Sequence, residues 1–320
     1  MMKKNICCYF TDFWDGFDYK FHFGFLLSEY EFVIDKKNPD YLFYSCFGMN
    51  HLNYDRCVKI FWSGENVQPD LNLCDYAVSL SDIQCGDRIY HQYLTLIWKD
   101  KKLYDMDLTA GQLLDRKFCN FVYSNNCMAD PIREQLFNLL SKYKRVDAGG
   151  SFLNNIGGRV TDKHSFLKEY KFTLAIENSS LPGYSTEKIY DPFLARSLPI
   201  YWGDPNISSN YHSNSFVNLK DYCSVEEAIE EIIRLDNDDD AYLEKMATPF
   251  WPYGDSFEEF RNAEKERLRT FYRHIFEQPL EKAGRRTKYG CVMSYSRQMR
   301  IHYLFPERVV MGKIKRLIKK

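Results

Sequence analysis

The segment from residue 170 to residue 205, YKFTLAIENSSLPGYSTEKIYDPFLARSLPIYWGDP, reads as strand, polar loop, helix and strand in succession. Apolar and aromatic residues fill KFTLAIE, turn-forming residues follow, and Ser185, Thr186 and Glu187 are typical of a helix start. Parallel sheets are built from units of this kind. Because free N–H groups and the helix dipole favour negative charge, the segment predicts an α/β fold with an anion-binding loop.

The same alternation of apolar runs and polar loops extends along most of the chain. The expected strands are residues 5–10, 32–34, 41–46, 58–62, 76–80, 118–123 and 145–147. The expected helices are residues 131–143, 165–170, 225–235, 241–245 and 257–276. Residues 92–117 have a poor pattern, so we expect two successive α/β units with a boundary near residue 117.

Composition limits the class of protein. The chain has 320 residues, of which 45% are hydrophobic and 17% aromatic, enough for more than one core. Ten scattered cysteines without a CxxC motif favour reduced thiols over disulfides or a zinc site. No apolar run approaches the roughly 20 residues that span a bilayer, and the N-terminus leads directly into a strand, so we expect a cytoplasmic location.

Charge is unevenly distributed. Residues 285–320 contain eleven Lys or Arg and one acid, Glu307, whereas residues 1–284 contain 32 basic and 43 acidic residues. The last stretch, PERVVMGKIKRLIKK, interleaves apolar and basic residues as a helix lying on anionic lipid does. Peripheral binding at the inner face of the cytoplasmic membrane and a solvated basic tail both fit. A nucleic-acid partner is not expected, because no stacking motif accompanies the tail.

The segment FTLAIENSSLPGYSTEKIYDPFLARSLPIYWGDP resembles the signature of the α1,3/4-fucosyltransferase family, glycosyltransferase family 10. That signature has an F-x-L-x-x-E-N-S block, a Y-x-T-E-K core and a P-I/V-Y/V-x-G-x-P end. FCNFVYSNN with the following PIRE, and FWSGENVQPDLNLCDYAVSL, resemble two further family blocks. The blocks occur in the expected order, and the similarity spans roughly residues 5–250.

The resemblance implies a GT-B fold, in which two Rossmann-like domains face each other across a cleft. Residues 1–117 are then the acceptor-side domain and 118–275 the GDP-fucose-binding domain, and the charge pattern adds residues 276–320 as a helical, basic and amphipathic C-terminal tail. The implied reaction is an inverting transfer of L-fucose from GDP-β-L-fucose to N-acetylglucosamine in N-acetyllactosamine-type (Lewis antigen) glycans, as in bacterial members. No cofactor is expected to be required, and a divalent cation at most stimulates the reaction.

A sugar hydroxyl is a poor nucleophile, so the reaction needs a carboxylate that accepts its proton. Glu65, in SGEN after an expected strand, matches the position at which the family block places its proposed base. Asn66 is expected beside it on the acceptor side. From the residues alone, Glu65 also fits a solvent-exposed loop position.

Charge that develops on the departing pyrophosphate is expected to meet cations and helix N-termini. Arg133 lies in the first turn of a helix begun by Pro131, and Lys188 lies in the first turn of the next. Each alone would also fit a surface cation. The loop between residues 124 and 133 is slightly long for the family.

The remaining donor-side residues are polar or permit close approach to a ligand. Glu187 can accept hydrogen bonds from ribose or fucose hydroxyls, and Asn178 and Tyr184 lie at the same rim. Glu177 either faces the fucose or holds the loop by accepting backbone N–H bonds. Guanine is expected near residues 121–126 and 146–152, which adds Ser124, Asn125 and Gly150 to this set.

Three alternative functions fit parts of the sequence. One is a GT-B transferase that uses another nucleotide sugar, because a fold does not determine the donor. Another is a non-catalytic nucleotide- or glycan-binding protein, against which Glu65 argues. The third, suggested by the tail alone, is a membrane-bound adaptor. The choice between α1,3 and α1,4 linkage and the identity of the acceptor stay open.

Overall fold

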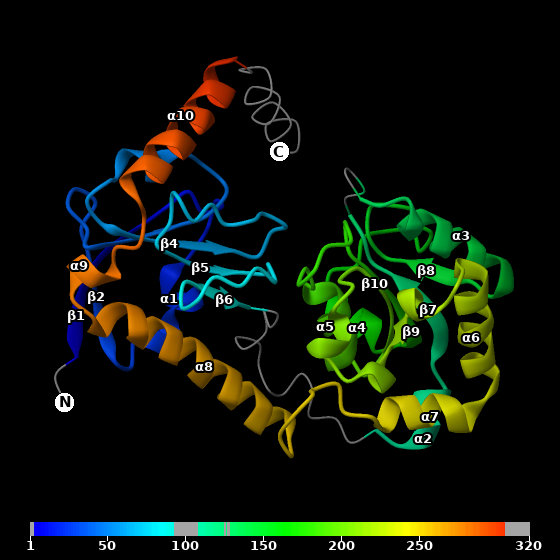
Figure 1. Ribbon diagram of the computed structural model, residues 1–320. Helices are drawn as coiled ribbons and strands as arrows, with labels where there is room; N and C mark the ends of the chain where they lie inside the picture. The colour runs from blue at the N-terminus through cyan, green and yellow to red at the C-terminus, as the bar shows by residue number, and fades with distance from the viewer. Residues whose placement is uncertain (1–2, 93–107, 125, 127–128, 305–320) are drawn as a thin grey trace. The chain divides into compact units, whose positions relative to one another are not determined.

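The computed structural model describes residues 3–92, 108–124, 126 and 129–304 (Figure 1). The chain divides into two compact units. The first comprises the described residues within Met1–Ser79, Ile83–His91 and Arg267–Lys320, and the second those within Leu80–Asp82 and Gln92–Glu266.

The first unit is built on a six-stranded sheet with the order β2-β1-β3-β4-β5-β6, in which every pairing is parallel. Its strands are β1 (Lys4–Thr11), β2 (Tyr30–Ile34), β3 (Tyr41–Tyr44), β4 (Val58–Ser63), β5 (Tyr76–Ser79) and β6 (Ile89–His91). All residues of β3, β4 and β5 are buried, which explains their nearly continuous apolar sequences.

The connections after β1 and β3 run on opposite faces of this sheet. The first contains α1 (Tyr19–His22) and the 3-10 helix η1 (Gly24–Leu26), and its Phe23 packs against Phe43 of β3 at 5.0 Å between ring centroids. The second contains η2 (Asn50–Asn53), and its His51 stacks on Tyr44 at 4.2 Å. Neighbouring residues of a strand point to opposite faces, so the carboxyl ends of β1 and β3 form a topological switch point, where α/β sheets usually bind ligands.

A long helix, α8 (Phe257–Glu277), begins in the second unit and ends in the first. Tyr272 and Phe276, both 0% exposed, cover the first sheet beside Phe43. The short helix α9 (Leu280–Ala283) and α10 (Lys288–Leu304) follow in the first unit.

Buried Asp75 fastens the segment before α10 to the first unit. It accepts the backbone N–H groups of Arg285 and Arg286, and its Oδ2 lies 2.9 Å from Nε of Arg286. The first unit therefore includes residues from 267 onward, whereas the expected domains were 118–275 and 276–320. The periodicity of α8 shows that the helix has an apolar face, but it does not show which sheet that face covers. Residues 305–320, which include the whole expected lipid-binding stretch 306–320, lie outside the described part of the chain.

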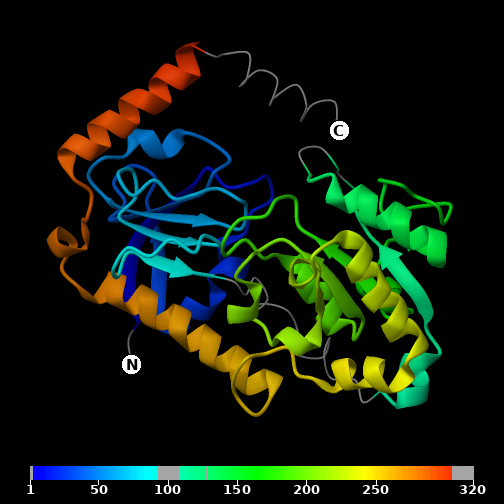
Figure 2. The same ribbon diagram turned by 45° about the vertical axis from the view of Figure 1, so that its right-hand side comes forward.

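The second unit contains a parallel five-stranded sheet with the order β11-β10-β9-β7-β8. Its strands are β7 (Lys117–Phe121), β8 (Val146–Ala148), β9 (Tyr170–Ile176), β10 (Leu198–Trp202) and β11 (Val217–Asn218). Its helices are α2 (Ala110–Leu114), α3 (Ile132–Tyr143), α4 (Lys163–Leu167), α5 (Glu187–Leu194), α6 (Val225–Asn237) and α7 (Asp239–Ala247), and α3 and α6 lie side by side (Figures 1 and 2).

The chain passes from β7 to β8 on one side and then to β9 on the other side of β7. The switch point of the second sheet is therefore at the carboxyl ends of β7 and β9, where the segment of residues 170–205 places its polar loop. The expected strands all form. Strands β6 and β11, of three and two residues, were not predicted because such short segments carry little pattern. The helix expected at residues 165–170 ends at Leu167, and Tyr170 begins β9.

Candidate active site

The loop from Glu177 to Thr186, here called the signature loop, joins β9 to α5. Thr186 is the N-cap of α5, and its hydroxyl accepts the N–H of Lys188 at 3.4 Å. Gly183 has a φ of +84° and donates its N–H to Asp204 at 2.9 Å. A Cβ at Gly183 would lie 2.5 Å from the carbonyl oxygen of Leu80, so only glycine fits this turn.

Glu177 is fully buried and holds the two ends of the signature loop together. Its Oε1 accepts the N–H of Thr186 at 2.7 Å and the Thr186 hydroxyl at 2.9 Å. Its Oε2 lies 3.2 Å from Nζ of Lys188. A Cβ at Gly203 would lie 2.5 Å from Cγ of Glu177, so this glycine leaves room for the carboxylate.

The electrostatics of the pair follow from burial and mutual attraction. Burial raises the pKa of Glu177, whereas Lys188 and the hydrogen bonds from Thr186 oppose this increase. Burial also acts to lower the pKa of Lys188, but the charges of Glu177 and Glu187 outweigh it and hold that pKa above its ordinary value. Lys188 is therefore a protonated cation at the N-terminus of α5, with 15% of its side chain exposed.

Arg133 lies in the first turn of α3, as predicted, but it is 0% exposed. Its Nη2 donates to the carbonyl oxygen of Ile176 at 3.0 Å and to Oδ1 of Asn178 at 2.6 Å. The guanidinium carbon lies 4.2 Å from the ring centroid of Tyr123. Arg133 thus supplies positive charge beneath the strand ends and orients Asn178, and it is enclosed rather than open to a ligand.

Two other predicted residues differ strongly in exposure. Tyr184 is 4% exposed, whereas the side chain of Glu187 is 50% exposed and lies 3.5 Å from Nζ of Lys188. Burial of the Glu187 carboxyl acts to raise its pKa, but Lys188 and Lys163 lower it below the ordinary value. The ionised carboxylate of Glu187, a hydrogen-bond acceptor, and the ammonium group of Lys188 therefore lie together at the start of α5.

The loops after β7 and β8 bring Ser124 and Gly150 together. The Ser124 carbonyl accepts the Ser151 hydroxyl at 3.1 Å, and a Cβ at Gly150 would overlap the backbone of Tyr123. Asn125 lies outside the described residues. Sequence reasoning missed Arg159, which donates to the Ser124 hydroxyl at 3.1 Å; its place after the glycine pair at residues 157 and 158 was the available signal.

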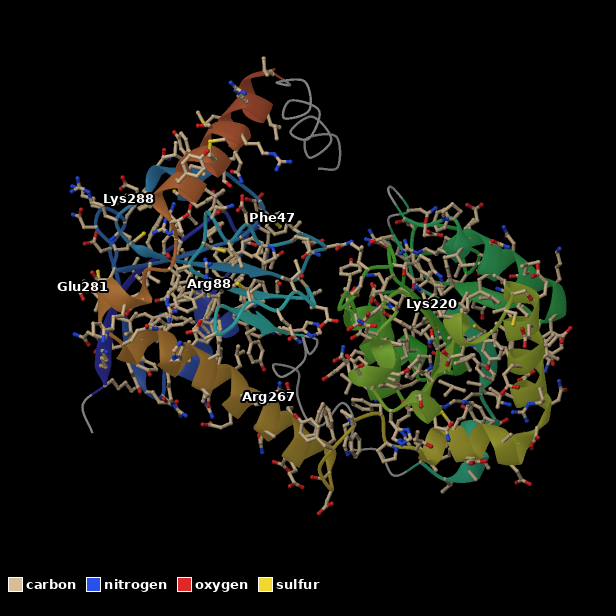
Figure 3. The ribbon with its side chains drawn as sticks, in the orientation of Figure 1. Phe47, Arg88, Lys220, Arg267, Glu281 and Lys288 are labelled. Carbon is tan, nitrogen blue, oxygen red and sulfur yellow. The ribbon has the colours of Figure 1, made fainter. Side chains whose placement is uncertain are left out.

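Lys220 was also missed. It follows β11 at the same carboxyl edge, donates to the Ser180 hydroxyl and lies 5.7 Å from the ring centroid of Trp202 (Figure 3). A two-residue strand gave no sequence signal for this position.

Glu65 and Asn66 belong to the first unit and follow β4 at the carboxyl edge of its sheet. Glu65 is exposed, and its backbone N–H donates to Oγ of Ser63 at 3.0 Å. Ser63 thereby fixes the turn that carries the carboxylate. The predicted base and the signature loop are each at the carboxyl edge of their own sheet.

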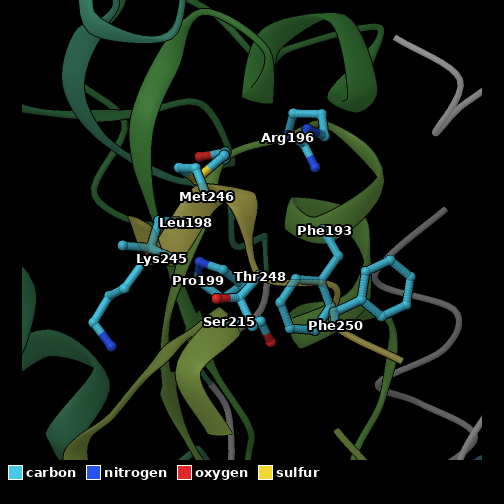
Figure 4. A pocket seen from close by; sticks show the side chains of 10 residues that line it. Phe193, Arg196, Leu198, Pro199, Ser215, Lys245, Met246, Thr248 and Phe250 are labelled. Atoms are coloured by element: carbon cyan, nitrogen blue, oxygen red, sulfur yellow. The ribbon is translucent and has the colours of Figure 1, made fainter. Parts of the chain in front are cut away.

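A small pocket of about 20 Å³ lies elsewhere in the second unit (Figure 4). Leu198 and Pro199, at the start of β10, line it together with Phe193 and Phe250. This is the amino end of the strand, opposite the signature loop, and the pocket contains none of the predicted site residues.

Other features bear on cofactors and membranes. Within the described residues, no group of three His, Cys, Asp or Glu could hold a metal ion. No helix of the described part is both long and apolar enough to cross a bilayer. The nine cysteines described there are free.

Two family models match the chain. The Alpha-(1,3)-fucosyltransferase FucT N-terminal domain matches residues 8–96, and the C-terminal model of Glycosyltransferase family 10 (fucosyltransferase) matches residues 113–248. Among curated proteins, Alpha-(1,3)-fucosyltransferase FucT of Helicobacter pylori is 30% identical over 294 residues. The match covers 79% of the present chain, which spans 61% of that relative's length.

Solved structures agree with this result. A crystal structure of an alpha1,3-fucosyltransferase has a TM-score of 0.71 and 27% identity, covering 86% of this chain and 91% of that one. A crystal structure of alpha1,3-fucosyltransferase with GDP-fucose has a TM-score of 0.70 and 27% identity, covering 87% and 92%. With the two parallel sheets, these similarities confirm the predicted α/β GT-B fold class.

Proposed function

The chain belongs to glycosyltransferase family 10, the fucosyltransferases, and from this premise we propose that it transfers L-fucose from GDP-β-L-fucose to a sugar hydroxyl of a glycan. The observation that carries the proposal is Lys188, held by buried Glu177 at the N-terminus of α5 and at the switch point of the second sheet. A similar protein was crystallised with GDP-fucose.

On the donor side, Lys188 and the N-terminus of α5 counter the charge that develops on the departing diphosphate. Exposed Glu187 accepts hydrogen bonds from sugar hydroxyls. Arg133 is buried and does not contact the donor; it contributes through its positive charge and by orienting the side-chain amide of Asn178. Gly150 lets the loop after β8 pack on the backbone of Tyr123, which holds together the loops expected to bind the nucleoside, and Ser124 and Tyr184 complete the rim.

On the acceptor side, Glu65 is the general base and Asn66 contacts the same sugar. The acceptor oxygen attacks the anomeric carbon of fucose while its proton passes to the Glu65 carboxylate. The bond from that carbon to the diphosphate oxygen breaks, and GDP leaves with the electron pair. Attack from the opposite face inverts the β-linked donor into an α-linked product.

The acceptor that fits the family signature is N-acetylglucosamine within an N-acetyllactosamine-type glycan, joined through an α1,3 or α1,4 linkage. The reaction needs no cofactor in this scheme. The alternative is a transfer from another nucleotide sugar, because the fold alone does not determine the donor.

One experiment tests the reaction and its donor. The protein is incubated with GDP-fucose, UDP-galactose or UDP-N-acetylglucosamine and with N-acetyllactosamine, lacto-N-biose or lactose. We expect an acceptor heavier by one deoxyhexose with GDP-fucose alone, and thermal stabilisation by GDP but not by UDP. Transfer from a UDP-sugar would show that the donor is that nucleotide sugar and not GDP-fucose. The absence of both transfer and GDP release would contradict the proposal.

We also propose that the basic C-terminal segment binds an anionic membrane surface. Helix α10 exposes Tyr289, Val292 and Met293 by 78%, 62% and 53%, and Arg297 and Arg300 are on the same helix. Sedimentation with vesicles of anionic or of purely zwitterionic lipid tests this. Binding to anionic vesicles that falls as salt increases is expected, and equal sedimentation with both would contradict it.

A further inference from the structure

At the switch point of the first sheet, Asp12 holds the loop that follows β3. Its φ is +59°, a region that non-glycine residues rarely occupy. Its carboxylate accepts the N–H groups of Asn50 and His51 at 2.9 and 2.8 Å and contacts Nδ1 of His51 at 2.8 Å. A Cβ at Gly48 would lie 2.3 Å from Oδ1 of Asp12, so the close approach of loop residues 47–51 to this carboxylate requires glycine at position 48.

The loop fixed by Asp12 contributes one end of a row of aromatic rings. Phe47 lies 5.9 Å from Trp14 between ring centroids, at 75°, and Trp14 lies 5.9 Å from Trp62, at 42°. Phe47, which is labelled in Figure 3, follows β3, whereas Trp14 follows β1 and Trp62 is near the end of β4. The three rings therefore gather at the carboxyl edge of the adjacent strands β1, β3 and β4.

This row differs from the core beneath it. Phe23 and Phe43, on the same face, are 1% and 0% exposed, whereas Trp14 and Phe47 are partly exposed and lie beyond the strands. Rings that only filled the core would lie between the sheet and its helices. The aromatic row instead presents ring surface at the edge where α/β sheets bind ligands.

His22 lies within the row and adds a polar atom. Its ring is 5.1 Å from Trp14 and 5.6 Å from Trp62. Its Nδ1 is enclosed and has no hydrogen-bond partner among the described residues. Burial lowers the pKa of His22, so the neutral imidazole is favoured. The row thus combines apolar ring faces with an uncommitted hydrogen-bonding group, and it carries no formal charge.

The row ends near the predicted base, because Glu65 follows Trp62 by three residues. A pyranose ring has one apolar C–H face and a rim of hydroxyls, whereas a nucleotide diphosphate would need cations that the row does not contain. We propose that Trp14 and Phe47, supported by the buried Trp62, bind the apolar face of the acceptor sugar, with Trp14 as the residue that determines acceptor affinity. This inference rests on the proposed function, since it assigns the acceptor of the same reaction.

The kinetic test compares Trp14→Ala, Trp14→Phe and the control Val33→Ala, which shortens a 43% exposed apolar side chain of β2 in the same unit. Trp14→Ala should raise the KM for N-acetyllactosamine at least tenfold and leave GDP affinity and the KM for GDP-fucose within twofold. Trp14→Phe should recover most of the acceptor affinity, and Val33→Ala should match the wild type.

A binding test separates this inference from the proposed reaction. N-acetyllactosamine, without donor, should change the indole fluorescence of the wild type in a saturable way, and Trp14→Phe should lose most of that change. If no transfer occurs but this signal does, the proposed function fails and the sugar site stands. An unchanged acceptor KM in Trp14→Ala, no fluorescence response in the wild type, or an equal loss of GDP and acceptor affinity would overturn the inference.

Discussion

The ammonium group of Lys188 lies 3.2 Å from Oε2 of Glu177, a carboxylate without exposed surface. Both residues flank the signature loop, and Thr186 contacts both: its N–H and hydroxyl donate to Glu177, and its hydroxyl accepts from Nζ of Lys188 at 3.1 Å. A residue of the strand end and a residue of the helix start are thereby joined by charge. The shape of the loop and the position of its cation depend on the same contact.

Lys188→Met should therefore impair folding and donor binding together. Removal of one partner leaves the buried Glu177 charge unpaired, which costs about 3–5 kcal/mol. The free energy of unfolding in urea and GDP affinity by calorimetry measure the two effects. The double variant Glu177→Gln with Lys188→Met should regain stability but not GDP affinity, and a double variant as unstable as Lys188→Met would show that the pair is not coupled.

Glu65→Gln should reduce fucose transfer by about 10²–10⁴-fold, the usual contribution of a general base. The amide cannot accept the acceptor proton, whereas the donor-side residues belong to the second unit and Glu65 to the first. Transfer rate by product mass and GDP affinity by calorimetry are measured together. Glu31→Gln, an exposed glutamate of β2, is the control. Normal turnover by a folded Glu65→Gln protein would remove Glu65 from the role of base.

Asp12→Asn should destabilise the protein by about 1–3 kcal/mol at neutral pH, because a hydrogen bond to an ionised group is lost. Burial acts to raise the pKa of Asp12, but its bonds to His51 and Asn50 hold this pKa below the ordinary value. A lowered folded-state pKa gives stability that is complete above the unfolded value, about 3.9, and is lost as pH falls through the folded value.

Urea unfolding at several pH values checks this sign. The contribution of Asp12 to the difference in free energy of unfolding between the wild type and Asp12→Asn should be constant from pH 5 to pH 8. Below about pH 4 this difference should shrink. Asparagine tolerates the positive φ, so the backbone is not the cause. A difference that grows in acid would contradict the interpretation.

Gly150→Ala should destabilise the protein by about 3 kcal/mol or more. The added Cβ overlaps backbone atoms of Tyr123, which cannot move aside as the end of a flexible side chain could. GDP affinity should fall as the loops after β7 and β8 separate. Gly158→Ala in the same loop meets nothing within 4 Å and is the matched control, with a thermal midpoint at or slightly above that of the wild type. Equal midpoints for the two variants would show that the close approach does not constrain the loop.

Local sequence predicted what depends on neighbouring residues. Thr186 was recognised as a helix start because its hydroxyl serves the first turn, and the strands were recognised from apolar runs, which the structure buries. The enclosure of Arg133 was not predictable, since Tyr123 and the carbonyl of Ile176 come from two other segments. Likewise, the aromatic row joins residues 14, 47 and 62, and no single stretch of sequence contains it.

The segment of residues 170–205 by itself determined a strand, a polar loop and a helix start in succession, because the apolar pattern and helix capping act within a few residues. Only the tertiary structure decided which charges meet there: Glu177 is buried against Lys188 because β10 and the signature loop close over it, with Gly203 leaving the space. The tertiary structure also decided that α8 and the chain after it join the first unit, through Tyr272, Phe276 and Asp75. Burial and charge pairing depend on segments far apart in the chain, and a local pattern does not specify such contacts.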